Sequence, residues 1–225
     1  MEANSRRLTV LLALLLPACL LPAQGPGYLG RHTLLGGDVH FFPSLSNLLD
    51  PEGASGLNGH AGLVLEQVIG RRLSLGASLH YAPTRMTYSY DSVAGVALMR
   101  GWTAGLRLRS YTFRRRGNIA PMGPYQQIEL RYLGYRITDY DRRFYADGRS
   151  DLGFHSDWVL LAGLGTQRMA GERLCWRAGL QAGWVMNPRP NRSDPQEQYL
   201  RDRATDRWRG FWIINPEFGV SVLLW

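Results

Sequence analysis

The chain contains no lysine, so all 26 residues in its Lys+Arg total are arginine. Cysteine is almost absent as well, with only Cys19 and Cys175. Beyond Leu21, no apolar run approaches the roughly 18 residues that identify a membrane-spanning helix. These absences exclude a helical membrane bundle. They also exclude an intramolecular disulfide if Cys19 is removed with an N-terminal leader.

The N-terminus has the pattern of a secretory signal peptide. Arg6 and Arg7 precede the apolar run Leu8–Leu16, and small residues follow as far as Ala23. We therefore predict a signal peptide at 1–23 and a mature domain at 24–225. A membrane anchor is the first alternative, but the run is shorter than the roughly 20 residues that a spanning helix needs. A lipoprotein signal ending at Cys19 is the second, and Pro17 is unfavourable there.

The charge balance is basic, with a formal net charge of +8. Genomic base composition is the simplest explanation for the choice of arginine over lysine. Guanidinium groups also pair bidentately with carboxylates and phosphates, which suits a charged protein interior or an anionic lipopolysaccharide surface. The arginines are spread along the chain without a recognition module, which disfavours a nucleic-acid partner.

Alternation of apolar and polar residues is the main pattern after the leader. Between Leu73 and Tyr81, for example, leucine, alanine and tyrosine alternate with serine, glycine and histidine. Such alternation is typical of half-buried strands and does not fit helices. It predicts eight strands, at about 32–42, 60–69, 73–81, 99–113, 125–138, 158–168, 174–184 and 217–224.

Alternation alone does not say which face contacts water. A soluble lipocalin-like barrel buries its apolar side chains, whereas a membrane barrel turns them outward. The second frame carries Gly, Ser, Gln, Glu and Arg, which is too polar for a dry core. Trp102, Trp158, Trp176 and Trp184 lie near strand ends in the apolar frame, as in an interfacial aromatic girdle. We therefore predict an all-β fold: an eight-stranded antiparallel up-and-down transmembrane β-barrel.

The connectors alternate in length. Those at 70–71, 114–124 and 170–173 lie on one side of the predicted barrel, and those at 43–59, 85–97, 139–154 and 187–210 lie on the other. Outer-membrane barrels have short periplasmic turns and longer external loops. The pattern predicts that both ends of the barrel domain lie on the periplasmic side.

Two short segments, Gly27–Arg31 and Ile119–Tyr125, together with the barrel pattern, resemble the small outer-membrane β-barrel domain proteins of Gram-negative bacteria. The resemblance implies this fold and an outer-membrane location, and it implies little about activity. The C-terminus looks like a signal read by the barrel-insertion machinery, formed by Glu217, Gly219, Val222, Leu224 and Trp225. The alternative is an ordinary amphipathic last strand.

The frame that should face the lumen concentrates charge. Its ionisable residues are Asp38, His40, Glu66, His80, Arg107, Arg109, Glu129, Arg131, Arg177 and Glu217. Because side chains fill so narrow a barrel, we interpret the charged members as a structural ion-pair network rather than a pore.

Catalysis has one weak candidate, the set Ser78, His80 and Glu66. A lipid-modifying enzyme needs its nucleophile and base at the lipid-facing surface, and these three residues belong to the lumen frame. No His or Cys cluster has metal-ligand spacing along the chain. We therefore expect no catalytic residue, no metal and no cofactor.

The predicted loop 187–210 mixes both signs of charge. Acidic residues alternate there with six arginines, namely Arg189, Arg192, Arg201, Arg203, Arg207 and Arg209. A solvated loop is the simpler interpretation. Binding of lipopolysaccharide phosphates or of a surface partner is the functional alternative.

The sequence thus predicts a monomeric, non-enzymatic barrel of the cell outer membrane. Its expected role is structural or surface-binding, in the manner of an adhesin, and its expected partners are outer-membrane lipid and lipopolysaccharide. A lipid A-modifying acyl hydrolase or transferase and a soluble lipocalin-like ligand-binding barrel are the alternatives.

Overall fold

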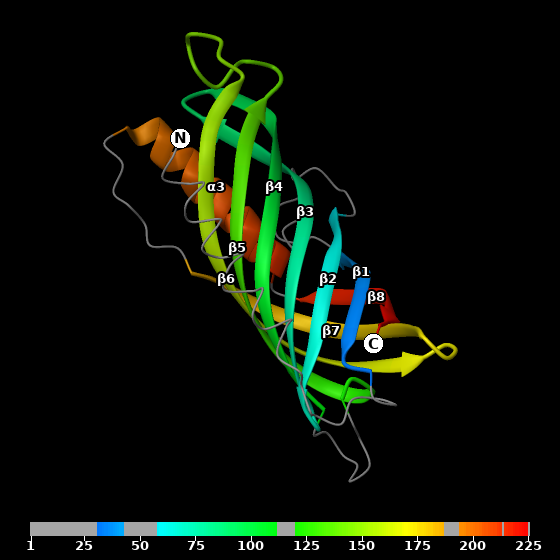
Figure 1. Ribbon diagram of the computed structural model, residues 1–225. Coiled ribbons are helices and arrows are strands. Elements are labelled where there is room, and N and C mark those ends of the chain that lie inside the picture. Colours follow the sequence, from blue (N-terminus) through cyan, green and yellow to red (C-terminus); the bar gives the residue numbers. More distant parts are fainter. Residues whose placement is uncertain (1–30, 43–57, 112–119, 187–193, 213, 225) are drawn as a thin grey trace, which may run out of the picture.

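The computed structural model describes residues 31–42, 58–111, 120–186, 194–212 and 214–224. Eight strands close into a ring in which each pairs antiparallel with the next, and β8 returns to pair with β1 (Figure 1). The strands are β1 (Thr33–Phe42), β2 (Asn58–Gly70), β3 (Leu73–Tyr90), β4 (Val93–Ser110), β5 (Gly123–Asp139), β6 (Asp151–Met169), β7 (Leu174–Met186) and β8 (Asn215–Leu223). The predicted all-β, eight-stranded up-and-down fold is confirmed.

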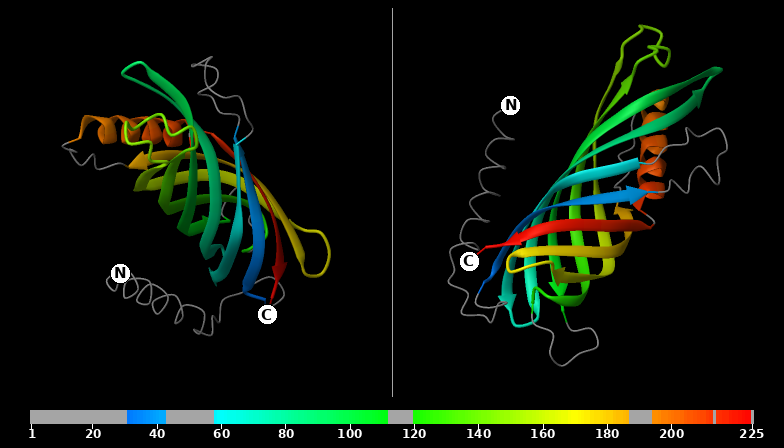
Figure 2. Two further views of the ribbon diagram at one scale, coloured as in Figure 1. Left: turned by 90° about the horizontal axis from the view of Figure 1, so that it is seen from above. Right: turned by 90° about the vertical axis from the view of Figure 1, so that its right-hand side faces the viewer.

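The strands differ strongly in length. β1 and β8 have 10 and 9 residues, whereas β3, β4 and β6 have 18, 18 and 19. Strands β3–β6 therefore rise beyond the ring and form a wall above one of its rims (Figures 1 and 2). We call residues 82–101, 133–139 and 151–157 of this wall the upper extension, and the opposite rim, which carries the β2–β3 and β6–β7 turns, the lower rim.

The predicted loops at 85–97 and 139–154 were wrong. β3 continues to Tyr90 and β4 begins at Val93, joined by Asp91 and Ser92 with φ angles of 48° and 71°. Two successive positive φ angles are typical of a two-residue hairpin turn whose twist matches the flanking strands. The loop predicted at 139–154 is shorter in the structure, because β6 begins at Asp151 and only residues 140–150 connect it to β5.

A reversal of polarity explains why these strand ends were missed. Within the ring, inward side chains of β3 such as His80 are polar and outward ones such as Tyr81 are apolar. Above it, inward Met86 and Tyr88 are apolar and buried, whereas outward Arg85 and Ser89 are exposed. The alternation continues, but the two frames exchange character, so a search for one apolar frame ends the strand near Tyr81.

A helix, α3 (Pro195–Trp212), occupies most of the region predicted as a loop at 187–210. Asp194 caps it, because its side chain accepts a hydrogen bond of 2.9 Å from the Gln196 backbone N–H and Pro195 follows at the first helical position. Leu200, Ala204 and Trp208 recur every four residues and are fully buried. No described helix is long and apolar enough to cross a membrane.

Helix α3 lies across the inner side of the upper extension, in orange in Figure 1, and it contacts β3, β6 and β7. Its apolar residues join the largest buried cluster, which includes Met86, Tyr88, Tyr135 and Val159. Tyr199 fastens the helix to the tip of β3, since its hydroxyl donates to the Ser89 carbonyl at 2.6 Å and accepts from the Ser89 N–H at 2.8 Å. The helix therefore covers the apolar lining that the long strands would otherwise expose.

Candidate functional site

The interior of the ring holds a network of buried ion pairs. All eight charged residues predicted for the lumen point inward and are at most 2% exposed: Asp38, Glu66, Arg107, Arg109, Glu129, Arg131, Arg177 and Glu217. They comprise four carboxylates and four guanidinium groups, so their formal charges balance. The burial cost of each charge is thereby offset by a partner of opposite sign.

Glu217 of β8 is the centre of this network. Its carboxylate lies 3.1 Å from Arg107 Nη1, 2.9 Å from Arg109 Nη2 and 2.9 Å from Arg177 Nε. It also accepts hydrogen bonds from the side-chain amides of Gln127 and Gln181. One carboxylate thus ties together β4, β5, β7 and β8.

The other carboxylates extend the network around the ring. Arg107 and Arg131 share Glu129, with N–O distances of 2.7 and 2.6 Å. Arg109 binds Glu66 at 2.6 Å, and Glu66 also accepts from Ser74 and from the Tyr111 hydroxyl. These contacts hold β2–β5 in one register.

Apolar clusters lie on both sides of the network. Towards the upper extension is the cluster that contains Trp208 and Tyr135. Within the same cluster, burial raises the pKa of the Tyr145 phenol, and the Arg149 guanidinium that lies 3.7 Å from its ring centroid opposes the rise. Towards the lower rim, Val68, Tyr111, Ala120 and Tyr125 form a second apolar cluster. The ionic network therefore has apolar neighbours towards both rims.

Ser78, His80 and Glu66, the catalytic candidates of the sequence analysis, do not form a catalytic arrangement. Ser78 and His80 both point into the lumen, but the Ser78 hydroxyl donates to Glu129 at 2.7 Å instead of facing the imidazole. Glu66 is engaged by Arg109 and Ser74. None of the three side chains faces outward.

Three histidines that sequence spacing did not connect lie together at the upper edge of the network. The ring centroids of His40, His60 and His80 are 4.4–5.1 Å apart, and all three rings are buried. Asp38 contacts His80 Nε2 directly and lies 3.5 Å from His40 Nε2. Among the described residues, Asp38, His40 and His80 can offer three ligand atoms that all lie within 4.8 Å of one another, as a metal ion requires.

Strand register produces this cluster. His40 of β1 is directly opposite His60 of β2, and Gly62 separates Asp38 from His80 in the next row. A Cβ at position 62 would lie 2.5 Å from His80 Cδ2, so the missing side chain leaves room for the imidazole to cross β2 and reach Asp38. The inward frame of each strand was visible in the sequence, but the pairing that brings these rows together was not.

The outer wall of the ring is apolar. Leu63, Leu106, Ile128 and Leu164 are each at least 50% exposed, and Trp184 is 74% exposed. The four tryptophans predicted for a girdle all point outward. Two cross-strand aromatic pairs, Tyr81 with Trp102 and Tyr132 with Trp158, have ring centroids 5.1 and 5.3 Å apart near the base of the upper extension. A soluble lipocalin-like barrel would place this frame inside.

A row of outward arginines lies directly above these aromatic pairs. Arg85, Arg100 and Arg136 are exposed, and Arg100 is the cross-strand partner of Arg136. Like charges opposite each other destabilise a sheet. The nearby polar groups relieve this only in part: Arg100 donates to the Tyr140 hydroxyl at 2.8 Å, and Arg136 lies 3.7 Å from Asp151. The pair could bind an anion.

Three of the six arginines predicted for a surface loop can be described, and they lie on α3. Arg201 is 7% exposed and lies 3.9 Å from Asp157 of β6, because it falls on the buried side of α3, so its assignment to a free surface was wrong. Arg203 and Arg207 are partly buried on the same helix. Arg189, Arg192 and the side chain of Arg209 lie outside the described residues.

The predicted assembly signal runs along β8. Glu217 and Gly219 face the lumen, Val222 faces outward, and Leu224 follows the end of the strand. Trp225, the signal peptide at 1–23 with Cys19, and segment Gly27–Gly30 lie outside the described residues. Cys175 is buried beside Leu34 and Leu223.

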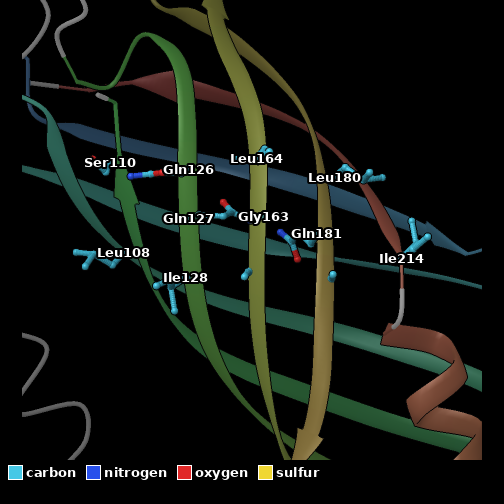
Figure 3. Close-up of a pocket in the computed structure, with 12 residues that line it drawn as sticks. Leu108, Ser110, Gln126, Gln127, Ile128, Gly163, Leu164, Leu180, Gln181 and Ile214 are labelled. Carbon is cyan, nitrogen blue, oxygen red and sulfur yellow. The ribbon is translucent and has the colours of Figure 1, made fainter. Parts of the chain in front are cut away.

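A hollow of about 650 Å³ indents the outer wall across β4–β7 (Figure 3). Leu108 and Ile128 line one side and Leu164 and Leu180 the other, with Gly163 between them. Its apolar lining belongs to the same outward frame.

Comparison with solved structures finds similar chains. The N-terminal β-barrel domain of Pseudomonas aeruginosa OprF aligns with 86% of this chain and 98% of its own length, at 10% identity and a TM-score of 0.46. No family model matches the sequence, and no curated protein matches it. Membership of the small outer-membrane barrel family therefore stays a prediction.

Proposed function

We propose that this chain is an integral protein of the Gram-negative outer membrane. In this proposal the sealed ring sits in the bilayer and carries a folded extension at the cell surface. The change in polarity along the upper strands, clearest in the two frames of β3, is the observation that supports it most. Outward side chains are apolar along the ring and become charged at Arg85, Arg100 and Arg136, as expected where a wall leaves the hydrocarbon layer for the headgroups.

The position of the aromatic residues supports the same boundary. Tyr81, Trp102, Tyr132 and Trp158 lie between the leucine band and the arginine row, which is where amphipathic rings are favoured at a membrane interface. The stretch from Arg100 to Ser110 corresponds to the roughly 9–11 residues of a tilted spanning strand. The compact β2–β3 and β6–β7 turns would then face the periplasm.

The role that fits this arrangement is structural or surface-binding rather than conducting. This preference is supported by the balanced ion-pair network and by the apolar clusters above and below it, because side chains fill the interior of so narrow a barrel. The part available to other molecules is the outer surface of the upper extension, which is polar along Arg85, Thr87 and Ser89. We therefore favour a membrane-anchored surface domain over a porin.

Cysteine labelling on intact cells tests both location and orientation. Asp91→Cys, at the tip of the β3–β4 hairpin, should react with a membrane-impermeant maleimide. Glu172→Cys, in the β6–β7 turn, should react only after the outer membrane is opened. Recovery of the protein in the aqueous fraction, or labelling of position 172 alone on intact cells, would contradict the proposal.

Planar-bilayer recording tests the sealed lumen. The purified protein, shown to be folded by faster gel migration before boiling, should produce no regular conductance steps. Reproducible unitary steps from the wild-type protein would show that the lumen opens.

The Arg100–Arg136 pair is proposed to bind lipopolysaccharide phosphates. A phosphate between two guanidinium groups would replace their mutual repulsion with charge-assisted hydrogen bonds. Arg100→Gln and Arg136→Gln should weaken binding of lipopolysaccharide to the micellar protein, while Arg168→Gln, an exposed arginine near the lower rim, should not. Equal binding by all variants, or equal binding of dephosphorylated lipid, would contradict this contact.

A further inference from the structure

We infer that the lumen contains a binding site for a borderline divalent transition-metal ion of the Zn²⁺ type, formed by Asp38, His40 and His80. The inference is independent of the membrane location, because it depends only on how β1, β2, β3 and β8 bring these side chains together. The three residues offer two imidazole nitrogens and one carboxylate oxygen within 4.8 Å of one another. That donor set suits Zn²⁺, Ni²⁺ or Cu²⁺ and is too rich in nitrogen for Mg²⁺ or Ca²⁺.

The hydrogen bonding of His40 prepares one ligand nitrogen. His40 Nδ1 lies 3.1 Å from Asn215 Oδ1, and since this amide oxygen can only accept, Nδ1 carries the proton. In the tautomer with a single proton on Nδ1, the lone pair is on Nε2, which lies 3.5 Å from Asp38 Oδ2. A ligating histidine usually donates its second N–H in this manner, which fixes both tautomer and ring orientation.

His80 supplies a second nitrogen in the same space. Its Nε2 contacts Asp38 Oδ1, and its Nδ1 has no hydrogen-bond partner although the ring is fully buried. A buried imidazole nitrogen left without a partner is costly in a purely structural core. Ligation gives the His40 and His80 rings a role that the ion-pair network does not provide.

The two arginines that pair with Asp38 both contact the same carboxylate oxygen. Arg177 Nη2 binds Oδ2 at 2.7 Å and Arg107 Nη2 lies 3.5 Å from the same oxygen, whereas Oδ1 faces His80. Because the four carboxylates and four arginines of the network already balance, the metal adds its charge to a region that is otherwise neutral. Neutral imidazole ligands suit this region, because they add no positive charge to that of the metal.

His60 packs against both proposed ligands, with ring centroids 4.4 Å from His40 and 5.1 Å from His80. His60 is not one of the proposed ligands; its packing restricts the rotation of the two ligating rings. Exchange of His60 for glutamine should therefore change affinity less than exchange of either ligand.

The test measures metal bound per chain. The full chain is refolded into detergent micelles with Zn²⁺, freed of excess metal by gel filtration, and analysed by elemental mass spectrometry and by competition with a chromophoric chelator. We expect one Zn²⁺ per chain in the wild type. Asn215→Ala, which removes the partner of His40, should weaken binding by about 10–100-fold, and His40→Gln and His80→Gln should weaken it further.

The matched control is His155→Gln, which removes a buried histidine of β6 that packs on Tyr135, away from Asp38. It should retain one Zn²⁺ per chain. Absence of Zn²⁺ from wild-type protein that shows the folded gel shift would overturn the site and leave the membrane proposal standing. Equal binding by wild type and His80→Gln would also overturn it.

Cobalt substitution keeps the inference testable if the histidine variants do not fold. Wild-type protein refolded with Co²⁺ should show the intense visible absorption of a four- or five-coordinate ion with nitrogen ligands. The weak spectrum of hexa-aqua Co²⁺, or none after gel filtration, would overturn the proposal.

Discussion

Single guanidinium groups inside the ring each contact more than one strand. Arg107 bridges Glu129 of β5 and Glu217 of β8, and Arg109 bridges Glu66 of β2 and the same Glu217. The planar fork of arginine presents several donors at fixed angles, which a lysine ammonium on a flexible stem does not. Whatever the cause of the arginine bias, the ion-pair network in the lumen uses the several donors of each guanidinium group.

Arg107→Met tests the network at its most connected cation. The change leaves Glu129 and Glu217 buried with one counter-charge fewer, so we expect a loss of about 3–5 kcal/mol in the free energy of unfolding. Denaturant titration of the micellar protein, followed by the heat-modifiable gel shift, measures it. The exposed Arg168→Met should change stability by less than about 0.5 kcal/mol. Equal stability of the two variants would show that the network contributes little.

Gly62→Ala tests the close approach of β2 to His80. The added methyl group would lie 2.1 Å from the Leu79 carbonyl oxygen and 2.5 Å from the imidazole, so either the strand or the ring must move. We expect a destabilisation of about 1–3 kcal/mol, the usual cost of overpacking. Gly171→Ala, where an added Cβ meets nothing within 4 Å, is the matched control and should be neutral. A neutral Gly62→Ala would mean that His80 does not lie across this glycine.

For single residues, the sequence predicted which way the side chains point but not which residues they contact. The period-two pattern placed the eight charged residues of the network in one frame, because alternate side chains on a strand point to the same face, and these eight side chains are buried in the structure. It could not pair Arg107 with Glu217, or gather His40, His60 and His80, because those contacts depend on the register between strands. The regular 20-residue spacing of the three histidines was a visible signal, and it becomes informative only once the strand lengths are known.

At the scale of elements, the largest error was a helix taken for a loop. Asp194, Pro195 and Glu197 form a helix-start signature of cap, first-turn proline and first-turn acid, and Leu200, Ala204 and Trp208 follow at helical spacing. The mixed charges between them obscured this stripe. The upper ends of β3, β4 and β6 were missed because the search assumed one apolar frame per strand, whereas the predicted end of β5 at 138 lies within one residue of the observed end at Asp139.

Trp208→Ala tests the docking of α3. The indole is fully buried against Tyr135, with ring centroids 5.6 Å apart. Its removal should cost about 3–5 kcal/mol of packing free energy, borne mostly by the helix and the upper extension. We expect faster amide hydrogen exchange in α3 and in β3 near Ser89, with exchange in the ring unchanged. Asp206→Ala, on the exposed side of α3, should exchange like the wild type, and a uniform response of all strands to Trp208→Ala would contradict this division.

At the scale of the whole molecule, one sequence distributes polarity in two opposite ways. The ring is apolar outside and ionic inside, as in a protein surrounded by lipid, whereas the upper extension buries a large apolar cluster and exposes polar residues such as Arg85, Arg100 and Arg136 beside Val96 and Phe154. Alternation predicted the eight strands, and the outward direction of the apolar frame followed only when the polar second frame and the tryptophan positions were added. The extension and its helix were not predicted, because the character of the two frames changes along the length of the strands.

Contacts between leucine methyl groups and lipid chains test this account most directly. In nanodiscs with methyl-labelled protein, nuclear Overhauser effects to acyl-chain protons should appear for Leu63, Leu106 and Leu160, which point outward, and be absent for Leu34, Leu133 and Leu161, which point inward. The reverse distribution, or acyl contacts to neither group, would show that lipid does not surround the ring.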